Sequence, residues 1–369
     1  MNINTKKSIV IGDLHFDDKA SIIDNEKDYL NKIKVLQNQV FPYMKENNIK
    51  TLIQVGDWTS KRTQLNTYVQ HHMKEDIFDY CESKDIHIYY IVGNHDIYYK
   101  NSLDIFTLEI FEKAYDNFHV IKRDEIIQFW DKQYYFIPWM LPEDEPRIQK
   151  VLKDNKVNKV FAHAEMKDFS VSKTYKSTHG LDKNYFKNIP VITGHYHLKQ
   201  QKDNIFFIGT PFENTWMDFK ESKGFYVLDH TVSVEEDMLF IKNDSTLMHL
   251  KVFINSEEKT IKVYGNIEAE LKIGTKTDYS ILKNNKVKIY LDLDNAYNKR
   301  VIEKIKEQVQ SYRVEILEDK IIKEEKVEVT VDNIVEYNIN SAITERLETT
   351  YQKDVFQEIN KLTEIDLKE

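Results

Sequence analysis

The chain has 369 residues, a net charge of -9 at pH 7 and a hydrophobic content of 41%, which predicts two or three domains with filled cores. Its acidic balance argues against a protein that binds nucleic acid through an overall basic surface. The single cysteine, Cys81, excludes an intramolecular disulfide, fits a reducing cytoplasm and is expected to be packed rather than reactive. The polar start at Met1–Lys7 resembles no signal sequence, and no apolar run is long enough to span a membrane.

Short apolar, β-branched runs in the first two thirds of the chain predict buried strands of an α/β sheet. They are Ser8–Ile11, Leu52–Val55, Ile88–Val92, Val160–Ala162 and Val191–Thr193. Helical patterns at Asn25–Asn47 and Leu65–Cys81 alternate with the first of these strands. We therefore expect residues 1–245 to form one α/β domain.

The pattern changes after Lys242–Ser245. A small α+β unit over residues 246–322 is predicted by strands at His249–Ile254, Thr260–Tyr264 and Lys286–Leu293, a helix at Ala296–Tyr312 and a closing strand at Val314–Ile322. In residues 323–369, apolar side chains recur four apart from Val335 to Ile359, which predicts one wrapping helix or two shorter ones. This apolar stripe needs a cover, either a partner or its own domain.

Metal-ligating side chains follow all of the predicted strands. They are Asp13, His15, Asp57, Asn94, His163, His195 and His197, with His95 and Asp96 beside them. Because the carboxyl ends of strands in such sheets form the ligand crevice, we expect these residues to converge. Asp, Asn and His together suit manganese, iron or zinc. The set exceeds the needs of one ion, whereas two ions with a bridging carboxylate would use it.

Each segment alone has a plainer explanation. Asn94 to Asp96 could form a turn, and a single histidine is usually a core or surface residue. The conjunction of all the segments, each after a strand, favours the metal site. The remaining histidines are treated as structural: His71, His72, His87, His119, His179, His230 and His249.

The order of these segments resembles the calcineurin-like metallophosphoesterase superfamily, whose pattern is DxH, GD, GNH(D/E), H and GHxH. Within it, residues 6–230 are most similar to the Mre-eleven/SbcD family of DNA repair nucleases, and among these to the recombination nucleases of T-even-type bacteriophages. The narrower resemblance is carried by Phe136–Met140, Ser177–Leu181, Ile208–Pro211 and Gly224–Asp229.

The resemblance implies a role for each residue. One ion would take Asp13, His15 and His197, and the second would take Asn94, His163 and His195, with Asp57 bridging them. The ions implied are two Mn²⁺, with Mg²⁺ or another divalent ion as alternatives. His95 would protonate the leaving 3′-oxygen or steady the phosphate, and Asp96 would accept its other ring N–H.

The resemblance also implies a fold and partners. The fold is a two-sheet α/β sandwich flanked by helices, a capping domain over 246–322 that positions DNA, and a C-terminal helical segment over 323–369 that binds an ATPase. The implied activity is manganese-dependent: a 3′ to 5′ exonuclease on duplex DNA and an endonuclease on single strands. The partner would be a Rad-fifty/SbcC-type ABC ATPase with a coiled coil, bound to a nuclease homodimer within a heterotetramer in the cytoplasm, the host's if a phage encodes the chain.

Two other functions stay open at this point. One is a metallophosphoesterase of another substrate class, such as a protein phosphatase or nucleotide phosphodiesterase. The other is a scaffold with a degenerate site, against which the complete ligand set argues. Ser60 stands where cellular relatives often carry His, which puts the balance of exonuclease and endonuclease activity in doubt. A local basic stripe could hold DNA, or its members could be ordinary solvated side chains: Lys61, Arg62, Lys100, Lys173 and Lys176. The acidic net charge favours a partner that supplies much of the grip on DNA.

Overall fold

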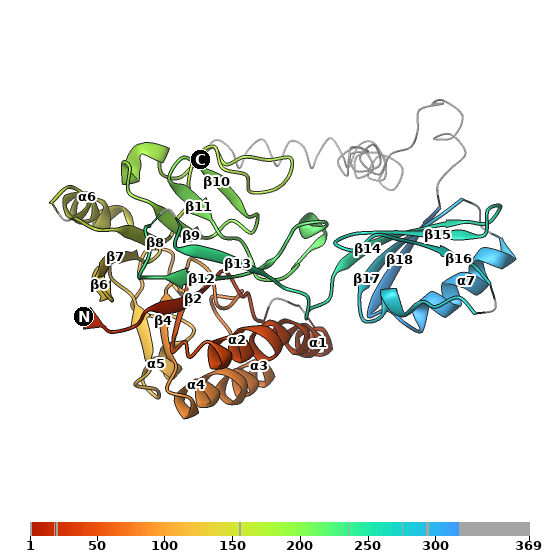
Figure 1. Cartoon of the computed structure of the whole chain (residues 1–369), viewed down its shortest axis with the longest axis horizontal. Helices are drawn as coiled ribbons and strands as arrows, with labels where there is room; N and C mark the ends of the chain where they lie inside the picture. The colour runs from red at the N-terminus through yellow and green to blue at the C-terminus, as the bar shows by residue number, and fades with distance from the viewer. Residues whose placement is uncertain are drawn as a thin grey trace, which may run out of the picture. The chain divides into compact units, whose positions relative to one another are not determined.

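The computed structural model describes residues 2–17, 19, 21–154, 156–234, 236–274, 276–292 and 295–316. The predicted C-terminal helices and the end of the predicted closing strand lie outside the described residues. Three sheets and their helices make up the described part (Figure 1). No helix in it is both long and apolar enough to cross a membrane.

The first sheet has six strands in the order β13-β12-β2-β3-β4-β5. β2, β3, β4 and β5 are parallel, and β12 and β13 extend the sheet in antiparallel fashion. Their bounds are β2 (Lys7–Ile11), β3 (Thr51–Gln54), β4 (His87–Ile91), β5 (Phe118–Ile121), β12 (Gly224–Asp229) and β13 (Met238–Lys242). Parallel neighbours cannot be joined by a tight turn, so a long crossover connection leads from each of the parallel strands to the next.

The second sheet has seven strands in the order β1-β6-β7-β8-β9-β11-β10. Their bounds are β1 (Asn2–Ile3), β6 (Glu125–Phe129), β7 (Lys132–Ile137), β8 (Lys159–His163), β9 (Val191–Gly194), β10 (Gln200–Lys202) and β11 (Ile205–Phe207). β7, β8, β9 and β11 are parallel to their neighbours in that series. The two sheets pack face to face through one apolar core, to which Val10 and Ile53 contribute from the first sheet and Phe161 from the second.

Helices cover the outer faces of this sandwich. α1 to α4 pack with the outer side of β2, β3 and β4, and Ile148 and Leu152 of α6 pack with β7 and β8 (Figure 1). Cys81 is the buried residue of α4, and burial raises the pKa of its thiol to about 12, as expected for a packed cysteine. The helical segments are α1 (Ile22–Lys32), η1 (Leu36–Val40), α2 (Phe41–Glu46), α3 (Thr67–Met73), η2 (Lys74–Asp79), α4 (Tyr80–Ser83), α5 (Glu109–Glu112), η3 (Pro142–Asp144), α6 (Glu145–Asp154), η4 (Lys183–Phe186), η5 (Trp216–Asp218) and η6 (Ser280–Leu282).

The third sheet has five strands in the order β16-β15-β14-β17-β18, and α7 packs on one of its faces (Figure 1). The bounds are β14 (His249–Asn255), β15 (Thr260–Tyr264), β16 (Ala269–Lys272), β17 (Lys286–Leu291), α7 (Ala296–Lys306) and β18 (Ser311–Ile316). The mixed α/β class and the two-sheet sandwich are therefore confirmed.

One predicted boundary in this part is wrong. The helix expected at Ala296–Tyr312 ends at Lys306, and Tyr312 lies in β18. Backbone hydrogen bonds of 2.8 Å from Asn284 N to Gln308 O and of 3.0 Å from Gln310 N to Asn285 O turn the chain there. The helical spacing of Val309 and Tyr312 was overridden by this pairing, which links residues far apart in the chain.

Candidate metal centre

The predicted ligands come together where strands of both sheets of the sandwich end. Asp13 and His15 follow β2, Asp57 follows β3, and Asn94 follows β4 in the first sheet. His163 is the last residue of β8, and His195 and His197 follow β9 in the second. All seven side chains lie in two adjoining groups, although about half the chain separates the first from the last.

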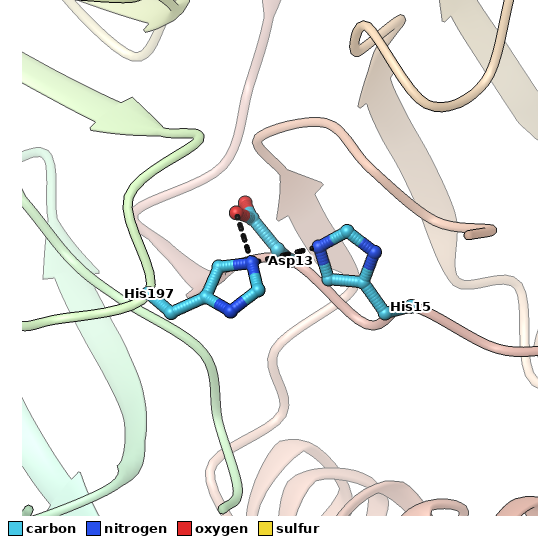
Figure 2. Close-up of side chains that lie close together, drawn as sticks. All are labelled: Asp13, His15 and His197. Atoms are coloured by element: carbon cyan, nitrogen blue, oxygen red, sulfur yellow. Dashed lines mark hydrogen bonds and ion pairs between the residues drawn. The ribbon is translucent and has the colours of Figure 1, made fainter. Parts of the chain in front are cut away.

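The first group is Asp13, His15 and His197, whose ligand atoms all lie within 4.8 Å of one another. The Nε2 atoms of His15 and His197 are 2.9 Å apart, and Nε2 of His197 is 4.0 Å from Oδ2 of Asp13. Figure 2 shows the three side chains pointing toward one another, with Asp13 and His15 on one loop and His197 on another.

The second group is Asp57, His163 and His195, whose ligand atoms also lie within 4.8 Å of one another. Asn94 completes it, because its Oδ1 lies 3.0 Å from Nε2 of His163 and 2.9 Å from Nδ1 of His195. The membership of both groups is that expected from the sequence, while their role as ligands stays a prediction.

Asp57 lies between the two groups. Its Oδ2 is 3.3 Å from Nε2 of His163 in the second group and 3.8 Å from Nε2 of His15 in the first. Its Oδ1 accepts a hydrogen bond of 2.8 Å from the backbone N–H of His95. One carboxylate oxygen thus faces both groups while the other is held by the chain, which is the placement that a bridging ligand needs.

Hydrogen bonds to protein groups orient the ligands. Nδ1 of His163 lies 2.8 Å from the carbonyl oxygen of Val55, to which it donates, so Nε2 faces the site. The backbone N–H of His195 donates to Oδ2 of Asp13 at 3.0 Å. The side chains therefore point into the site before anything binds there.

Two buried lysines, which the sequence analysis did not single out, support the loops that carry the first group. Lys32 Nζ donates to the carbonyl oxygen of His15 at 2.7 Å, and Lys223 Nζ donates to that of His197 at 2.7 Å. Each lysine is paired with a carboxylate, Lys32 with Asp28 at 2.7 Å and Lys223 with Asp218 at 2.6 Å. The four-residue spacing of Asp28 and Lys32 on a helix was a usable signal, whereas nothing local marks Lys223.

Glycines allow the loops to approach so closely. A Cβ atom on Gly93 would lie 2.3 Å from the backbone nitrogen and from Oδ1 of Asp57, and one on Gly56 would lie 2.1 Å from Nδ1 of His163. Three of the candidate residues also have left-handed backbones, with φ of 46° at His15, 54° at Asp57 and 89° at His195. Strain of this kind concentrates at functional sites, where surrounding contacts maintain it.

The electrostatics of the donor set fit divalent cations. Burial raises the pKa of Asp13 well above its usual value, and Asp57 adds to this, although His163 opposes it. Burial also lowers the pKa of His15, well below its ordinary value, and that of His195 to about 3. These imidazoles are thus neutral at pH 7, with lone pairs available for a metal.

The Asp57–His163 pair shows the same need for a cation. Burial opposes ionisation of Asp57, but the His163 imidazole, together with His15 and His95, holds the pKa of the carboxyl well below its usual range. Burial likewise lowers the pKa of His163, yet Asp57 outweighs it and raises that pKa to about 9. A proton on His163 thus compensates for the buried carboxylate, a task that a divalent ion also performs. Donor separations of 2.9 to 4.0 Å match those expected around an ion with bonds of roughly 2.0–2.2 Å.

His95 lies beside the first group but belongs to neither. Its ring centroid is 5.1 Å from that of His15, and its Nδ1 lies 2.9 Å from the carbonyl oxygen of Ser60, to which it donates. Its side chain is partly exposed, whereas His163 is fully buried. Nε2 of His95 therefore carries the lone pair of the neutral ring, or the proton of the cationic one.

The expected contact between Asp96 and His95 is wrong. Oδ2 of Asp96 accepts from the backbone N–H of Gly93 at 2.9 Å, and Oδ1 accepts from that of Thr59 at 3.0 Å. Asp96 is buried, and these two hydrogen bonds join its carboxylate to the loop after β3 and to the loop after β4. Ser60, where cellular relatives often have His, instead contributes its carbonyl to His95 and its Oγ to His15 Nδ1 at 3.3 Å.

Two further sets of residues lie outside the centre. Lys61 is tied into its own loop by Asp17 at 3.3 Å and by the carbonyl oxygen of Lys19 at 2.6 Å, so the alternative in which Lys61 helps to hold DNA gains no support. His71, His72 and Glu75 form a third group of possible ligands, on the surface of α3 and η2. Within the described residues, no further group of this kind occurs.

The fold and the site define a class: a two-sheet α/β sandwich with paired His and Asp donor groups at its strand ends, as in metal-dependent phosphoesterases. Residues 6–199 match the model of the calcineurin-like phosphoesterase family, and the chain belongs to this family, which uses divalent metals. The chain is also similar to exonuclease subunit 1 of Enterobacteria phage T4, with 28% identity over 309 residues, or 83% of this chain and 86% of that protein. The predicted superfamily is confirmed, and the phage relative supports the narrower resemblance to nucleases.

Proposed function

We propose that this phosphoesterase is a DNA nuclease with two metal ions, Mn²⁺ in preference to Mg²⁺. Asp13, His15 and His197 would hold one ion, and Asn94, His163 and His195 would hold the other. Asp57 would contribute to both. The observation that carries the proposal is the position of Asp57 Oδ2, 3.3 Å from His163 Nε2 and 3.8 Å from His15 Nε2. When bound, the ions would activate water and neutralise charge on the phosphate.

In this proposal His95 is the catalytic residue that acts on the leaving group. Its Nδ1 is engaged by the Ser60 carbonyl, so a proton for the leaving 3′-oxygen comes from Nε2. Asp96 acts as a positioning residue, because it holds the two loops that bear Asp57 and His95. Lys32 and Lys223 are positioning residues as well, because they donate to the backbone carbonyl oxygens of His15 and His197.

DNA is the proposed substrate because the phage relative is an exonuclease subunit that matches most of this chain. We infer a 3′ to 5′ exonuclease on duplex ends and an endonuclease on single strands. The word subunit in the relative's name favours a complex, and we propose a homodimer joined to a Rad-fifty/SbcC-type ABC ATPase in a heterotetramer. This complex would serve DNA recombination and repair in the cytoplasm of a host cell.

Digestion of end-labelled DNA tests the substrate class. With Mn²⁺, the full chain should shorten duplex DNA from its 3′ ends and cut single-stranded circles, and EDTA should stop both reactions. A phosphopeptide and a cyclic nucleotide serve as the competing substrates. Hydrolysis of either substrate in preference to DNA would contradict the nuclease proposal and would indicate a phosphatase or a nucleotide phosphodiesterase.

The three-part domain division is a proposal as well: 1–245 for hydrolysis, 246–322 for capping and 323–369 for the ATPase. Deletion of residues 333–369 should abolish binding of the coiled-coil ATPase but leave manganese-dependent hydrolysis of bis-p-nitrophenyl phosphate intact. Co-purification and a colorimetric assay measure the two effects. If the complex still forms after the deletion, the proposal that residues 323–369 bind the ATPase is wrong.

A further inference from the structure

A buried carboxylate joins the third sheet to the sandwich. Glu213 lies in the segment between β11 and β12, and His249 is the first residue of β14. Oε2 of Glu213 accepts hydrogen bonds from the backbone N–H of His249 at 2.7 Å and from its Nδ1 at 2.9 Å, and Oε1 accepts one of 2.6 Å from Nδ2 of Asn266. Glu213 and His249 are both buried. A carboxylate with three donors inside the protein holds these parts of the chain at fixed positions.

The same segment carries the support of a candidate metal ligand. Oδ2 of Asp218 accepts from the backbone N–H of Asn214 at 3.0 Å and from that of the next residue at 2.9 Å. Oδ1 of Asp218 is paired with Lys223 at 2.6 Å, and Lys223 donates to the carbonyl oxygen of His197 at 2.7 Å. Because Asn214 directly follows Glu213, a shift of Glu213 moves a backbone donor that Asp218 needs. The contacts therefore run without a gap from the third sheet to His197.

A second connection reaches the other histidine of the first group. Asn31 and Lys32 are adjacent at the end of α1, and both are buried. Oδ1 of Asn31 accepts from the backbone N–H of Leu247, just before β14, at 2.8 Å, and Lys32 donates to the carbonyl oxygen of His15 at 2.7 Å. The supports of both histidines in the first group are thus connected to the start of the third sheet.

The second group is oriented from within the sandwich. Nδ1 of His163 donates to the carbonyl oxygen of Val55, which follows β3, and His163 itself ends β8. Oδ1 of Asn94 lies 3.0 Å from Nε2 of His163 and 2.9 Å from Nδ1 of His195. These contacts link the two sheets of the sandwich with each other. Loss of a contact at the third sheet should therefore affect the first group and leave the second in place.

We propose that Glu213 and His249 are positioning residues for the first metal ion. They hold the segment that supports His197, and thereby set how tightly the first group binds its ion. This inference rests on the proposed two-metal function, and it makes the attachment of the third sheet a determinant of one ion and not of the other. Residues that orient metal ligands without touching the metal commonly change its affinity by roughly 10–100-fold.

Titration calorimetry of the full chain with Mn²⁺ tests the proposal. His249→Ala removes one of the donors to Glu213 and should weaken the first ion roughly tenfold, with the affinity for the second ion unchanged. His249→Asn keeps a side-chain donor close to the position of Nδ1 and should restore most of the affinity. The Asp13→Ala background tells the two ions apart, because it removes a ligand of the first ion only. His249→Ala should have no effect on the ion that remains there.

Two matched controls separate positioning from a general loss of stability. His230→Ala removes another fully buried histidine, whose ring forms hydrogen bonds with Ser8 and Tyr134 inside the sandwich. Lys220→Gln breaks an exposed ion pair of 2.9 Å with Glu268, which links the same segment to the third sheet but contributes little. The melting temperature should fall in His230→Ala as in His249→Ala. Both controls should nevertheless bind two Mn²⁺ ions with unchanged affinities.

Glu213→Gln keeps the shape of the side chain but replaces one acceptor by a donor, and provides the same test if His249→Ala does not fold. In either variant, unchanged Mn²⁺ affinities or an equal loss at both ions would overturn the proposal. The number of ions bound by the unchanged chain reports separately on the proposed function. Fewer than two ions there would reject the two-metal centre and this inference with it. Two ions without any effect of His249→Ala would reject only the positioning role.

Discussion

Single side chains at the centre differ in what their nitrogen atoms face. Nε2 of His163 faces Asp57, and Nδ1 of His195 faces Asn94, while both nitrogens of His15 have neighbours in the centre, Ser60 and His197. His95 has its Nδ1 on the Ser60 carbonyl and stands at the edge of the site, partly exposed. Asn94 and His95 are adjacent in one turn, yet we propose different roles for them, metal ligand for Asn94 and proton donor for His95.

His95→Ala should retain two metal ions and lose roughly 10²–10⁴-fold in hydrolysis, because a proton donor is removed while every candidate ligand remains. Metal analysis after gel filtration and turnover of bis-p-nitrophenyl phosphate measure the two effects. His71→Ala, on the exposed surface of α3, is the matched control and should retain full activity. Loss of metal from His95→Ala would overturn its proposed role.

Asp57→Ala should weaken both ions, because Oδ2 of this residue faces both donor groups. Asp13→Ala is the comparison, since Asp13 belongs to the first group only, and should retain one ion. Isothermal titration with Mn²⁺ gives the number of sites and their affinities. A full pair of ions in Asp57→Ala would contradict the bridge.

At the scale of elements, the ends of strands and the glycines beside them form the centre. Gly93, Gly56 and Gly194, in or beside the loops after β4, β3 and β9, lie where a side chain would collide with a candidate ligand. A Cβ on Gly194, for example, would lie 2.5 Å from Oδ1 of Asp13. The glycines thus set how closely the two sheets bring their ligands together.

Gly93→Ala should lower the affinity for Mn²⁺ at least tenfold and stability by about 1–3 kcal/mol, because the new methyl group displaces Asp57. Gly274→Ala is the control, since its Cβ would meet nothing within 4 Å. Titration calorimetry and urea unfolding of the metal-free chain compare the variants. Equal manganese affinity in both would show that Asp57 tolerates the shift.

At the scale of the whole molecule, the packing of two sheets buries polar groups that link them. His230 is fully buried, and its ring lies 2.8 Å from Ser8 Oγ through Nε2 and 2.9 Å from the Tyr134 hydroxyl through Nδ1. Ser8 belongs to the first sheet and Tyr134 to the second. Burial lowers the pKa of His230 to about 3. A histidine that the sequence marks only as structural thus joins the two halves of the sandwich.

The His230 shift predicts how stability depends on pH. The unfolded chain takes up a proton on this residue below about pH 6.5, whereas the folded chain does so only near pH 3. The unfolded state therefore binds more protons between these values, and stability falls as pH drops through that window, by an amount on the order of a few kcal/mol. Urea unfolding in EDTA from pH 7 to pH 4 measures it.

His230→Asn removes the titration, so its stability should fall less steeply with pH than that of the unchanged chain. The exposed His71→Asn is the control and should keep the original slope. The slope is compared rather than the absolute stability, because the buried substitution itself destabilises the sandwich. Identical slopes in His230→Asn and the unchanged chain would show that another group dominates.

Much of the sandwich and its site was predictable because local patterns carry them. Buried parallel strands read as continuous apolar runs, and the strand predicted at Val191–Thr193 lies within β9, which is parallel to both of its neighbours. Less was predictable where contacts across the chain decide the outcome. The helical pattern at Asn25–Asn47 is divided into α1, η1 and α2, a division that the pattern did not predict. β16 at Ala269–Lys272 was not expected, since its alternate residues are polar and its place is set by pairing with β15.

By itself, the sequence determined the chemistry of the site: Asp, Asn and His side chains after strands predict a centre suited to divalent metals, whatever the details of folding. Only the tertiary structure decided that Asp57 faces both groups, that Asp96 supports loops rather than His95, and that Lys32 and Lys223 hold ligand carbonyls. The reason is physical. Residue type fixes what a side chain can bind, but hydrogen-bond partners are chosen among groups brought together from distant parts of the chain, and no local pattern records that choice.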